Sequence, residues 1–270
     1  MPLEALIFDV DGTLAETEEL HRQAFNETFR AFGLDWTWDK EIYRDLLRIT
    51  GGRERIAHYI DEYAPPGGAG AVEKLRQMHA EKTQRYARLV RVGGVAARPG
   101  VRRLIEEAHD AGLRLAIATT TSPSNVEPLL DALIGPRARR WFGVIAAGDI
   151  VPAKKPAPDV YAHALNELRC NASDCVAFED SANGALAARR AGLAVVATPS
   201  LYSSDDDFSA AASVLSDLGE PREPLRHIDG WRFGKGFVDL AGLRSMLKVP
   251  ALARSRVRGA EIDFAGKAPL

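Results

Sequence analysis

The 270-residue sequence predicts an α/β fold: a doubly wound parallel sheet with an α-helical cap domain inserted into it. Two patterns indicate this fold. Over the middle of the chain, short apolar runs alternate with amphipathic segments that end in glycine, as in a parallel sheet covered by helices on both faces. Near the N-terminus, one apolar run is followed by a long stretch with helical periodicity only. We therefore assign residues 1–15 and 93–247 to the core and residues 16–92 to the cap, and we leave residues 248–270 unassigned.

The composition is that of a soluble globular protein. Apolar residues make up 46% of the chain and the formal net charge is −2, so neither a nucleic acid nor a membrane is an expected partner. No apolar run reaches the roughly 18 residues of a membrane span. The two cysteines, Cys170 and Cys175, form neither a disulfide framework nor a zinc cluster. We expect a monomer in the cytoplasm or another reducing, soluble compartment.

The first apolar run ends in two acidic residues, Asp9 and Asp11. Side chains two residues apart on a strand point the same way, so both carboxylates can face one cleft at the edge of the sheet. Two such close anions require a proton or a cation between them. A solvated turn is the plain alternative. A calcium loop is excluded, because Leu14 and Leu20 stand where it would need glycine and glutamate.

The cap region reads as a series of amphipathic helices without a strand. Capping residues, apolar spacing and glycine or proline breaks mark their limits. The expected helices run from Thr17 to Gly33, from about Asp39 to Leu47, through Ile56 and Tyr63 to Pro65, and from Leu75 to about Gly93.

The core region alternates between helices and strands. The expected helices are 101–111, 124–133, 158–168 and 182–191, and the expected strands are 113–119, 143–147, 175–179 and 193–197, with 213–215 as a late edge strand. Because the first strand must join this sheet, the cap is an insertion with hinges near Ala15 and Gly93.

Hydroxyl and lysine side chains follow two of these strands. Thr119 and Thr120 end one strand just before a helix, where hydroxyls and amides can hold phosphate oxygens. Threonine also suits strands and caps for purely structural reasons. Lys155 is restrained by the proline after it and can present one positive charge to a phosphoryl group. Most loop lysines, however, are only solvated.

A second strand, residues 175–179, also ends in acids, Glu179 and Asp180. Together with Asp9 and Asp11 they would form an all-oxygen site at one edge of the sheet. Hard oxygen ligands suit Mg²⁺ and do not suit zinc. The sequence therefore predicts a magnesium site.

In this order along the chain, these features resemble the haloacid dehalogenase superfamily of phosphotransferases, with a helical cap after the first strand. Within it the chain is most similar to the β-phosphoglucomutase-like group, and especially to the CbbY-type sugar-bisphosphate phosphatases, which act on xylulose-1,5-bisphosphate. The superfamily motifs are Asp9-Val10-Asp11-Gly12-Thr13, Thr119, Lys155 and Glu179-Asp180, and the closer resemblance lies in Glu16-Thr17, His21, residues 49–55, Lys82 and Tyr86.

The resemblance implies a mechanism. Asp9 would attack phosphorus and form an aspartyl phosphate, and Asp11 would act first as acid and then as base. Lys155 and Thr119 would hold the phosphoryl oxygens. The metal would bind the carboxylates of Asp9 and Asp180 and the backbone carbonyl of Asp11, with Glu179 bound directly or through water.

The cap would select the substrate. Arg53 and Arg55 lie in a glycine-rich segment that could bind a second, distal phosphate, and Arg53 is the favoured residue. Arg44 and Arg48, one helical turn apart, are further candidates, for which a solvated helix face is the alternative. Three further residues are candidates for substrate binding, although a lone helical histidine is more often structural: Glu16, His21 and Lys82.

Other functions remain open at this point. A phosphosugar mutase would return the phosphate to a sugar, and a phosphoglycolate-type phosphatase would act on a smaller ester. Thr13 favours hydrolysis by resemblance. A phosphoacceptor signalling module also uses an aspartate on such a sheet, but it has no use for the cap or for Asp11. A binding protein that has lost catalysis would not need all these acids and Lys155.

Overall fold

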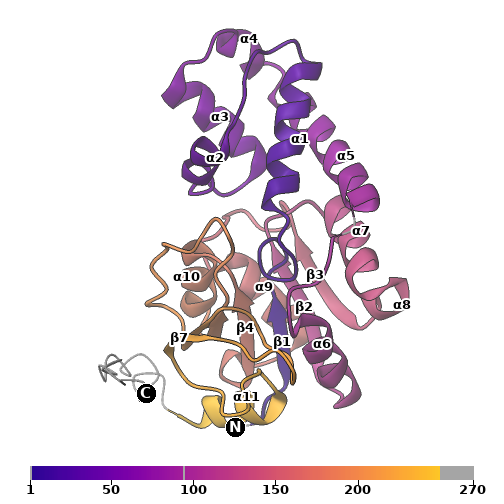
Figure 1. Cartoon of the computed structure of the whole chain (residues 1–270), viewed down its shortest axis with the longest axis vertical. Coiled ribbons are helices and arrows are strands. Elements are labelled where there is room, and N and C mark those ends of the chain that lie inside the picture. The colour runs from indigo at the N-terminus through magenta and orange to yellow at the C-terminus, as the bar shows by residue number, and fades with distance from the viewer. Residues whose placement is uncertain (1, 94, 250–270) are drawn as a thin grey trace, which may run out of the picture.

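The computed structural model describes residues 2–93 and 95–249, and its centre is one seven-stranded sheet (Figure 1). The strand order is β3-β2-β1-β4-β5-β6-β7, with β1 in the interior of the sheet. All neighbours are parallel except β6 and β7. The strands are β1 (Ala5–Phe8), β2 (Arg114–Thr119), β3 (Phe142–Ala147), β4 (Cys175–Glu179), β5 (Ala194–Ala197), β6 (Ser213–Leu215) and β7 (His227–Gly230).

Helices cover both faces of this sheet, as the alternating pattern predicts. One face packs on α6, α7 and α11, and the other on α9 and α10. Their bounds, with those of the short α8, are α6 (Val101–Asp110), α7 (Pro123–Ile134), α8 (Pro136–Arg139), α9 (Asp159–Leu168), α10 (Ala182–Arg190) and α11 (Leu240–Lys248).

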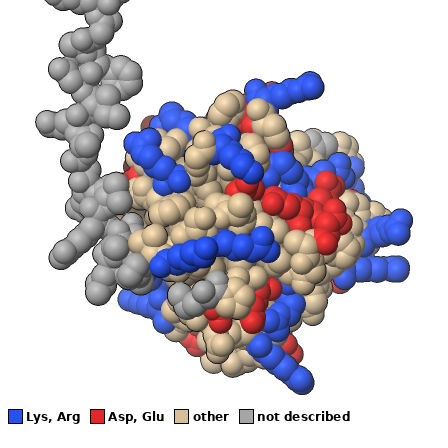
Figure 2. All heavy atoms as spheres, turned by 90° about the horizontal axis from the view of Figure 1, so that it is seen from below, with Lys and Arg blue, Asp and Glu red and all other residues tan. Residues whose placement is uncertain are grey.

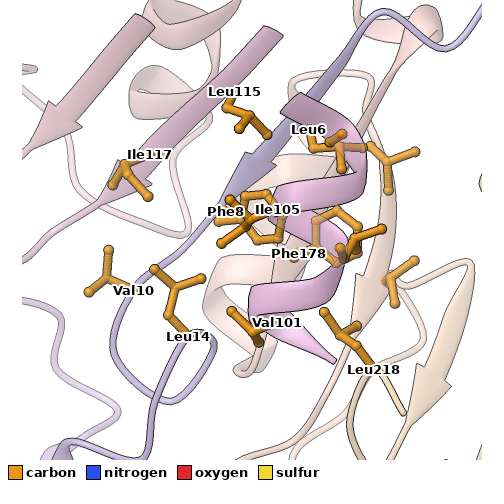
Figure 3. Packing of buried hydrophobic residues seen from close by; sticks show 14 of the residues in the cluster. Leu6, Phe8, Val10, Leu14, Val101, Ile105, Leu115, Ile117, Phe178 and Leu218 are labelled. Atoms are coloured by element: carbon orange, nitrogen blue, oxygen red, sulfur yellow. The ribbon is translucent and has the colours of Figure 1, made fainter. Parts of the chain in front are cut away.

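The alternation of side chains along β1 divides the core into two layers. Leu6 and Phe8 pack toward Val101 and Ile105 of α6 (Figure 3), whereas Ala5 and Ile7 belong to the cluster on the opposite face. All four strand residues are fully buried. A strand buried on both faces between parallel neighbours forms a rigid support for whatever follows its carboxyl end.

Five helices lie above the sheet in Figure 1, and the segment that they span, described over residues 18–93, contains no β-strand. They pack around an aromatic core that includes Phe25, Phe29, Trp36, Trp38 and Tyr43. The helices are α1 (Glu18–Ala31), α2 (Lys40–Leu46), α3 (Gly52–Tyr63), α4 (Gly68–Val72) and α5 (Leu75–Gly93).

Most predicted elements are confirmed, with two corrections at the end of the sheet. The segment at 213–215 is a strand but not the edge, because β7 pairs with it in antiparallel direction. The sheet is therefore not parallel throughout. Helices α4, α8 and α11 and strand β7 were not predicted, and residues 250–270 of the unassigned tail lie outside the described residues.

The surface agrees with the near-neutral composition. On the face seen in Figure 2, basic side chains are spread over the surface, and acidic side chains form one contiguous group on the right and smaller ones elsewhere. Among residues 2–93 and 95–249, no helix is both long and apolar enough to cross a membrane.

Candidate active site

A cavity of about 380 Å³ lies between the sheet and four of the five upper helices. The residues that line it come mainly from the carboxyl ends of strands β1, β2 and β4, from the loops after β3 and β5, and from α1, α2, α3, α5 and the loop between α2 and α3. Most ligand sites of open α/β sheets lie at this edge. The four predicted acids all line it: Asp9, Asp11, Glu179 and Asp180.

The loop after β1 carries the first two acids. The strand ends at Phe8, so Asp9 and Asp11 follow the strand instead of lying on it. Val10 still packs into the core between them, as the alternation predicts. Gly12 has φ +77°, and a Cβ there would overlap a carboxylate oxygen of Asp180. Only glycine allows this approach of the loop to the second acidic strand.

Lys155 joins the two acidic strands. Its Nζ lies 2.6 Å from Asp9 Oδ1 and 2.6 Å from Glu179 Oε1. Tyr161 of α9 donates a hydrogen bond to the same Glu179 oxygen. Burial raises the pKa of Asp9 to about 7, although Lys155 opposes this shift. Burial would lower the pKa of Lys155, but the carboxylates of Asp9 and Glu179 raise it above its usual value.

Three buried carboxylates form a group that fits a hard cation. One ligand oxygen from each of Asp9, Glu179 and Asp180 lies within 4.8 Å of the others. Glu179 Oε2 is buried and has no hydrogen-bond partner among the described residues. Burial, followed by the charges of Asp9 and Glu179, raises the pKa of Asp180 well above its usual value. An oxygen-only donor set with excess negative charge suits Mg²⁺.

Asp11 is held apart from this group. Its Oδ1 accepts hydrogen bonds from Thr17 at 2.5 Å, from His21 Nε2 at 2.9 Å and from Tyr86 at 3.3 Å, and its Oδ2 accepts one from Thr121. Burial acts to raise the pKa of Asp11, but His21 and the two threonines lower it well below its usual value. Thr17 occupies the cap position of α1, yet its hydroxyl bonds Asp11 and not the helix.

His21 and Lys82 form a buried pair behind Asp11. Lys82 Nζ lies 2.5 Å from His21 Nδ1, and the His21 ring stacks on Tyr86 with centroids 3.8 Å apart. Burial, and next the charge of Arg55, lowers the pKa of Lys82 to about 7. Both predicted residues are therefore in the site, connected to Asp11 by hydrogen bonds.

The end of β2 contributes three threonines. Thr119 and Thr120 line the cavity as predicted, and Thr119 Oγ1 accepts a hydrogen bond from the backbone of Thr121. The sequence analysis did not single out Thr121, which bonds Asp11. Three consecutive threonines in the sequence do not indicate which of them contacts Asp11.

The structure does not bring Arg53 into the cavity. Its side chain is 45% exposed and pairs with Glu54, whereas Arg55 lines the cavity together with Arg44 and Arg48. The reason is that helix α3 already begins at Gly52. Residues 53 and 55 are then about 200° apart around the helix axis, so only one of them can face the site.

Arg55 is fixed before any ligand arrives. It donates hydrogen bonds to the carbonyls of Leu46 and Ile49 and to the hydroxyl of Tyr43. Its guanidinium also lies 5.3 Å from the centre of the Tyr43 ring. A guanidinium with a fixed orientation is well suited to an anion, since little side-chain entropy is lost on binding.

Glu16 is another predicted residue that does not line the cavity. It is half-buried, with Oε1 3.5 Å from Arg98 Nε and Oε2 3.4 Å from the backbone nitrogen of Leu201. Glu18, two residues later, lines the cavity and accepts a hydrogen bond from Tyr43 at 2.6 Å. Helix α1 begins at Glu18, so Glu16 lies in the loop before the helix, and Glu18 lines the cavity in its place.

His79 was not singled out for a function, yet it lines the cavity. It lies on α5 three residues before Lys82, and burial and Lys82 lower its pKa to about 4. Its spacing from Lys82 and Tyr86 on one helix face was the available signal.

Comparisons with known proteins agree with this geometry. A family model described as haloacid dehalogenase-like hydrolase matches residues 3–192. Protein CbbY of Rhodobacter capsulatus is 56% identical over 81% of this chain and 95% of its own length, and a plasmid-encoded CbbY of Cupriavidus necator is 48% identical over 90% and 96%.

The solved structures extend the similarity to the whole fold. The crystal structure of a CbbY variant from Rhodobacter sphaeroides in complex with xylulose-(1,5)bisphosphate superposes with a TM-score of 0.78, at 47% identity, over 89% of this chain and 99% of that one. CbbY from the same organism in complex with phosphate gives the same TM-score at 46% identity, over 90% of this chain and 99% of that one. The chain belongs to the haloacid dehalogenase-like hydrolase family and is a phosphatase of the CbbY type.

Proposed function

We propose that this chain is a Mg²⁺-dependent phosphatase that hydrolyses a sugar bisphosphate, such as xylulose-1,5-bisphosphate, through an aspartyl phosphate on Asp9. The observation that carries the proposal is the distribution of charge around one cavity. Lys155 and three carboxylates lie on the sheet side, and three arginines lie on the helical side. A substrate with a phosphate at each end of a short sugar matches this arrangement.

Asp9 is the proposed nucleophile because its position is fixed by the strand before it and by Lys155. The salt bridge orients one carboxylate oxygen at 2.6 Å and leaves the other for phosphorus. Attack would form a bond from this oxygen to phosphorus and release the sugar oxygen. Lys155 and the hydroxyl of Thr119 would then stabilise charge on the phosphoryl oxygens.

The carboxylates of Asp9, Asp180 and Glu179, with the backbone carbonyl of Asp11, are the proposed ligands of Mg²⁺. A bound Mg²⁺ would neutralise the repulsion between the acids and an incoming phosphate. The partnerless oxygen of Glu179 supports this assignment, because a buried carboxylate oxygen without a donor is costly unless a cation or water meets it.

Asp11 is the proposed acid and base. It would give a proton to the sugar oxygen and later take one from the water that hydrolyses the aspartyl phosphate. The low pKa of Asp11 fits the second role directly, since an ionised carboxylate can accept a proton. For the first role Asp11 must gain a proton, and His21, which bonds it at 2.9 Å, would pass one on from Lys82, whose Nζ lies 2.5 Å from the other nitrogen of the ring.

The helical side of the cavity is proposed to bind the distal phosphate. Arg55 is the main candidate, with Arg44 and Arg48 nearer to solvent. Arginine is suited to phosphate because its planar donors can make two parallel hydrogen bonds. Glu18, His21 and Lys82 also line the cavity and are the proposed contacts for sugar hydroxyls.

The proposal is tested by phosphate release from a panel of sugar mono- and bisphosphates, each with Mg²⁺ and with a chelator. We expect turnover only with Mg²⁺, and the highest kcat/KM with a bisphosphate. Conversion of a sugar phosphate into an isomer without phosphate release would indicate a mutase instead. Preference for phosphoglycolate over every sugar bisphosphate would contradict the proposed substrate class.

A further inference from the structure

Arg98 is an arginine outside the cavity whose side chain is only 9% exposed. Its guanidinium donates hydrogen bonds to four backbone carbonyls that are distant in sequence: those of Gly12, Thr198 at 2.7 Å, Pro199 at 2.9 Å and Ser216 at 2.9 Å. Nothing in the proposed chemistry uses this residue. So many main-chain contacts from one buried cation indicate a specific task in positioning the backbone.

Two of the loops that Arg98 joins enclose a proposed metal ligand. A Cβ atom added to Gly12 would overlap Asp180 Oδ2 and would lie 3.0 Å from the Cβ of Ser200, so the three residues are in close contact. Ser203 holds the backbone of Asp180. Its hydroxyl donates a hydrogen bond to the Asp180 carbonyl and accepts one from the backbone N–H of Ser200. Asp180 is thus held between the Gly12 loop and the loop after β5.

Arg98 also joins the two chain segments that cross between the sheet and the upper helices. Arg98 itself lies on the segment that leads from α5 back to the sheet. Its backbone nitrogen donates to the carbonyl of Leu14 at 2.9 Å, and its Nε lies 3.5 Å from Glu16; both partners lie on the segment that leads from β1 to α1. Glu16 in turn accepts from the backbone of Leu201 in the loop after β5. One residue therefore connects the nucleophile loop, both crossings and the support of Asp180.

We propose that Arg98 is a positioning residue that holds the Gly12 loop and the loop after β5 at the separation at which Asp9 and Asp180 bind a divalent metal together. This inference rests on the proposed use of Mg²⁺. The planar guanidinium can donate to several carbonyls at once, whereas the ammonium of a lysine is a compact charge with a different donor geometry. Lysine at this position would leave buried carbonyls without donors, and the two loops would relax.

The test compares Arg98→Lys with a matched control, Arg103→Lys. Arg103 also donates to two backbone carbonyls, those of Leu218 and Gly219, and pairs with Glu220, but none of these partners lines the cavity that holds the acids. Mg²⁺ binding to each metal-free protein is measured by calorimetry, beside thermal unfolding and kcat. We expect Arg98→Lys to weaken Mg²⁺ binding about 10-fold or more and to lower kcat, and Arg103→Lys to change only Tm.

A second variant, Ser203→Ala, removes the hydroxyl that supports Asp180 and leaves Arg98 unchanged. It should weaken Mg²⁺ binding in the same direction, even if Arg98→Lys does not fold. Wild-type Mg²⁺ affinity in a folded Arg98→Lys, or in Ser203→Ala, would overturn the positioning role while leaving the proposed phosphatase intact. If the wild-type protein bound no Mg²⁺ at all, the metal proposal itself would fail, and this inference with it.

Discussion

The ammonium group of Lys155 lies 2.6 Å from the carboxylate of Asp9, although 146 residues separate them in sequence. The same nitrogen is equally close to Glu179. This contact places a permanent positive charge beside the proposed nucleophile and beside the position where a phosphoryl group would develop negative charge. Its removal should therefore affect catalysis more than binding.

Lys155→Met should lower kcat by at least about 100-fold with a much smaller change in KM, because the lost charge acts mainly in the transition state. Steady-state phosphate release at saturating Mg²⁺ measures both constants. Lys154→Met is the control, since Lys154 pairs with Asp149 and Glu54 and not with the nucleophile. Equal losses in the two variants would contradict the assigned role of Lys155.

Arg55→Met should raise the KM for sugar bisphosphates by about 10-fold or more, and should raise it less for monophosphates, because only the former have a distal phosphate to lose. Arg53→Met is a demanding control, since the sequence alone favoured Arg53 and the structure places it outside the cavity. Kinetics with a matched pair of mono- and bisphosphates decide between the two residues. A larger rise in the KM for bisphosphates in Arg53→Met than in Arg55→Met would support the sequence-based hypothesis that Arg53 binds the distal phosphate.

Mg²⁺ should raise the Tm of the wild-type protein, because a ligand that binds only the folded state stabilises it. The rise should be absent in Asp180→Asn. Asp174→Asn serves as control, since this buried acid lies before β4, at the strand's opposite end. Thermal unfolding across a Mg²⁺ titration provides the test, and an undiminished rise in Asp180→Asn would remove Asp180 from the metal site.

Lys82 should make the free energy of unfolding depend on pH. In the unfolded chain a lysine keeps its proton up to about pH 10.4, whereas the pKa of buried Lys82 is about 7. The unfolded chain then binds more protons between these values, so stability rises with pH in this window. Wild type should gain at least about 1 kcal/mol relative to Lys82→Met between pH 7 and pH 10, measured by denaturant unfolding.

The control for this pH dependence is Lys74→Met, which removes an exposed lysine just before the same helix. Between pH 7 and pH 10, wild type should gain no free energy of unfolding relative to Lys74→Met. A flat difference for Lys82→Met as well would mean that Lys82 keeps its proton inside the folded protein.

Much of the fold follows from local patterns in the sequence. Strands such as β4 are short, apolar and bounded by glycine or acidic residues, and α10 begins after Ser181, whose hydroxyl accepts from Gly184. The late elements were missed for a physical reason. Strand β7 has the sequence His-Ile-Asp-Gly and is partly exposed, so only its pairing with β6 makes it a strand.

The acids and Lys155 of the site were predictable because strand ends determine where they meet. Residues contributed by the helices were less so, since their direction depends on where each helix begins. The start of α3 at Gly52 decides between Arg53 and Arg55, and the start of α1 at Glu18 decides between Glu16 and Glu18. The contacts of Arg98 reach residues up to 118 positions away from it in sequence and have no local signature.

The central claim is that Asp9 attacks phosphorus, and the most direct measurement is acid-quenched mass spectrometry during turnover of a sugar bisphosphate with Mg²⁺. The claim predicts a phosphate adduct on the peptide that contains Asp9 in the wild-type protein, no adduct in Asp9→Asn, and at least about a 1,000-fold loss of turnover in that variant. An adduct on another residue, or robust turnover by Asp9→Asn, would contradict it.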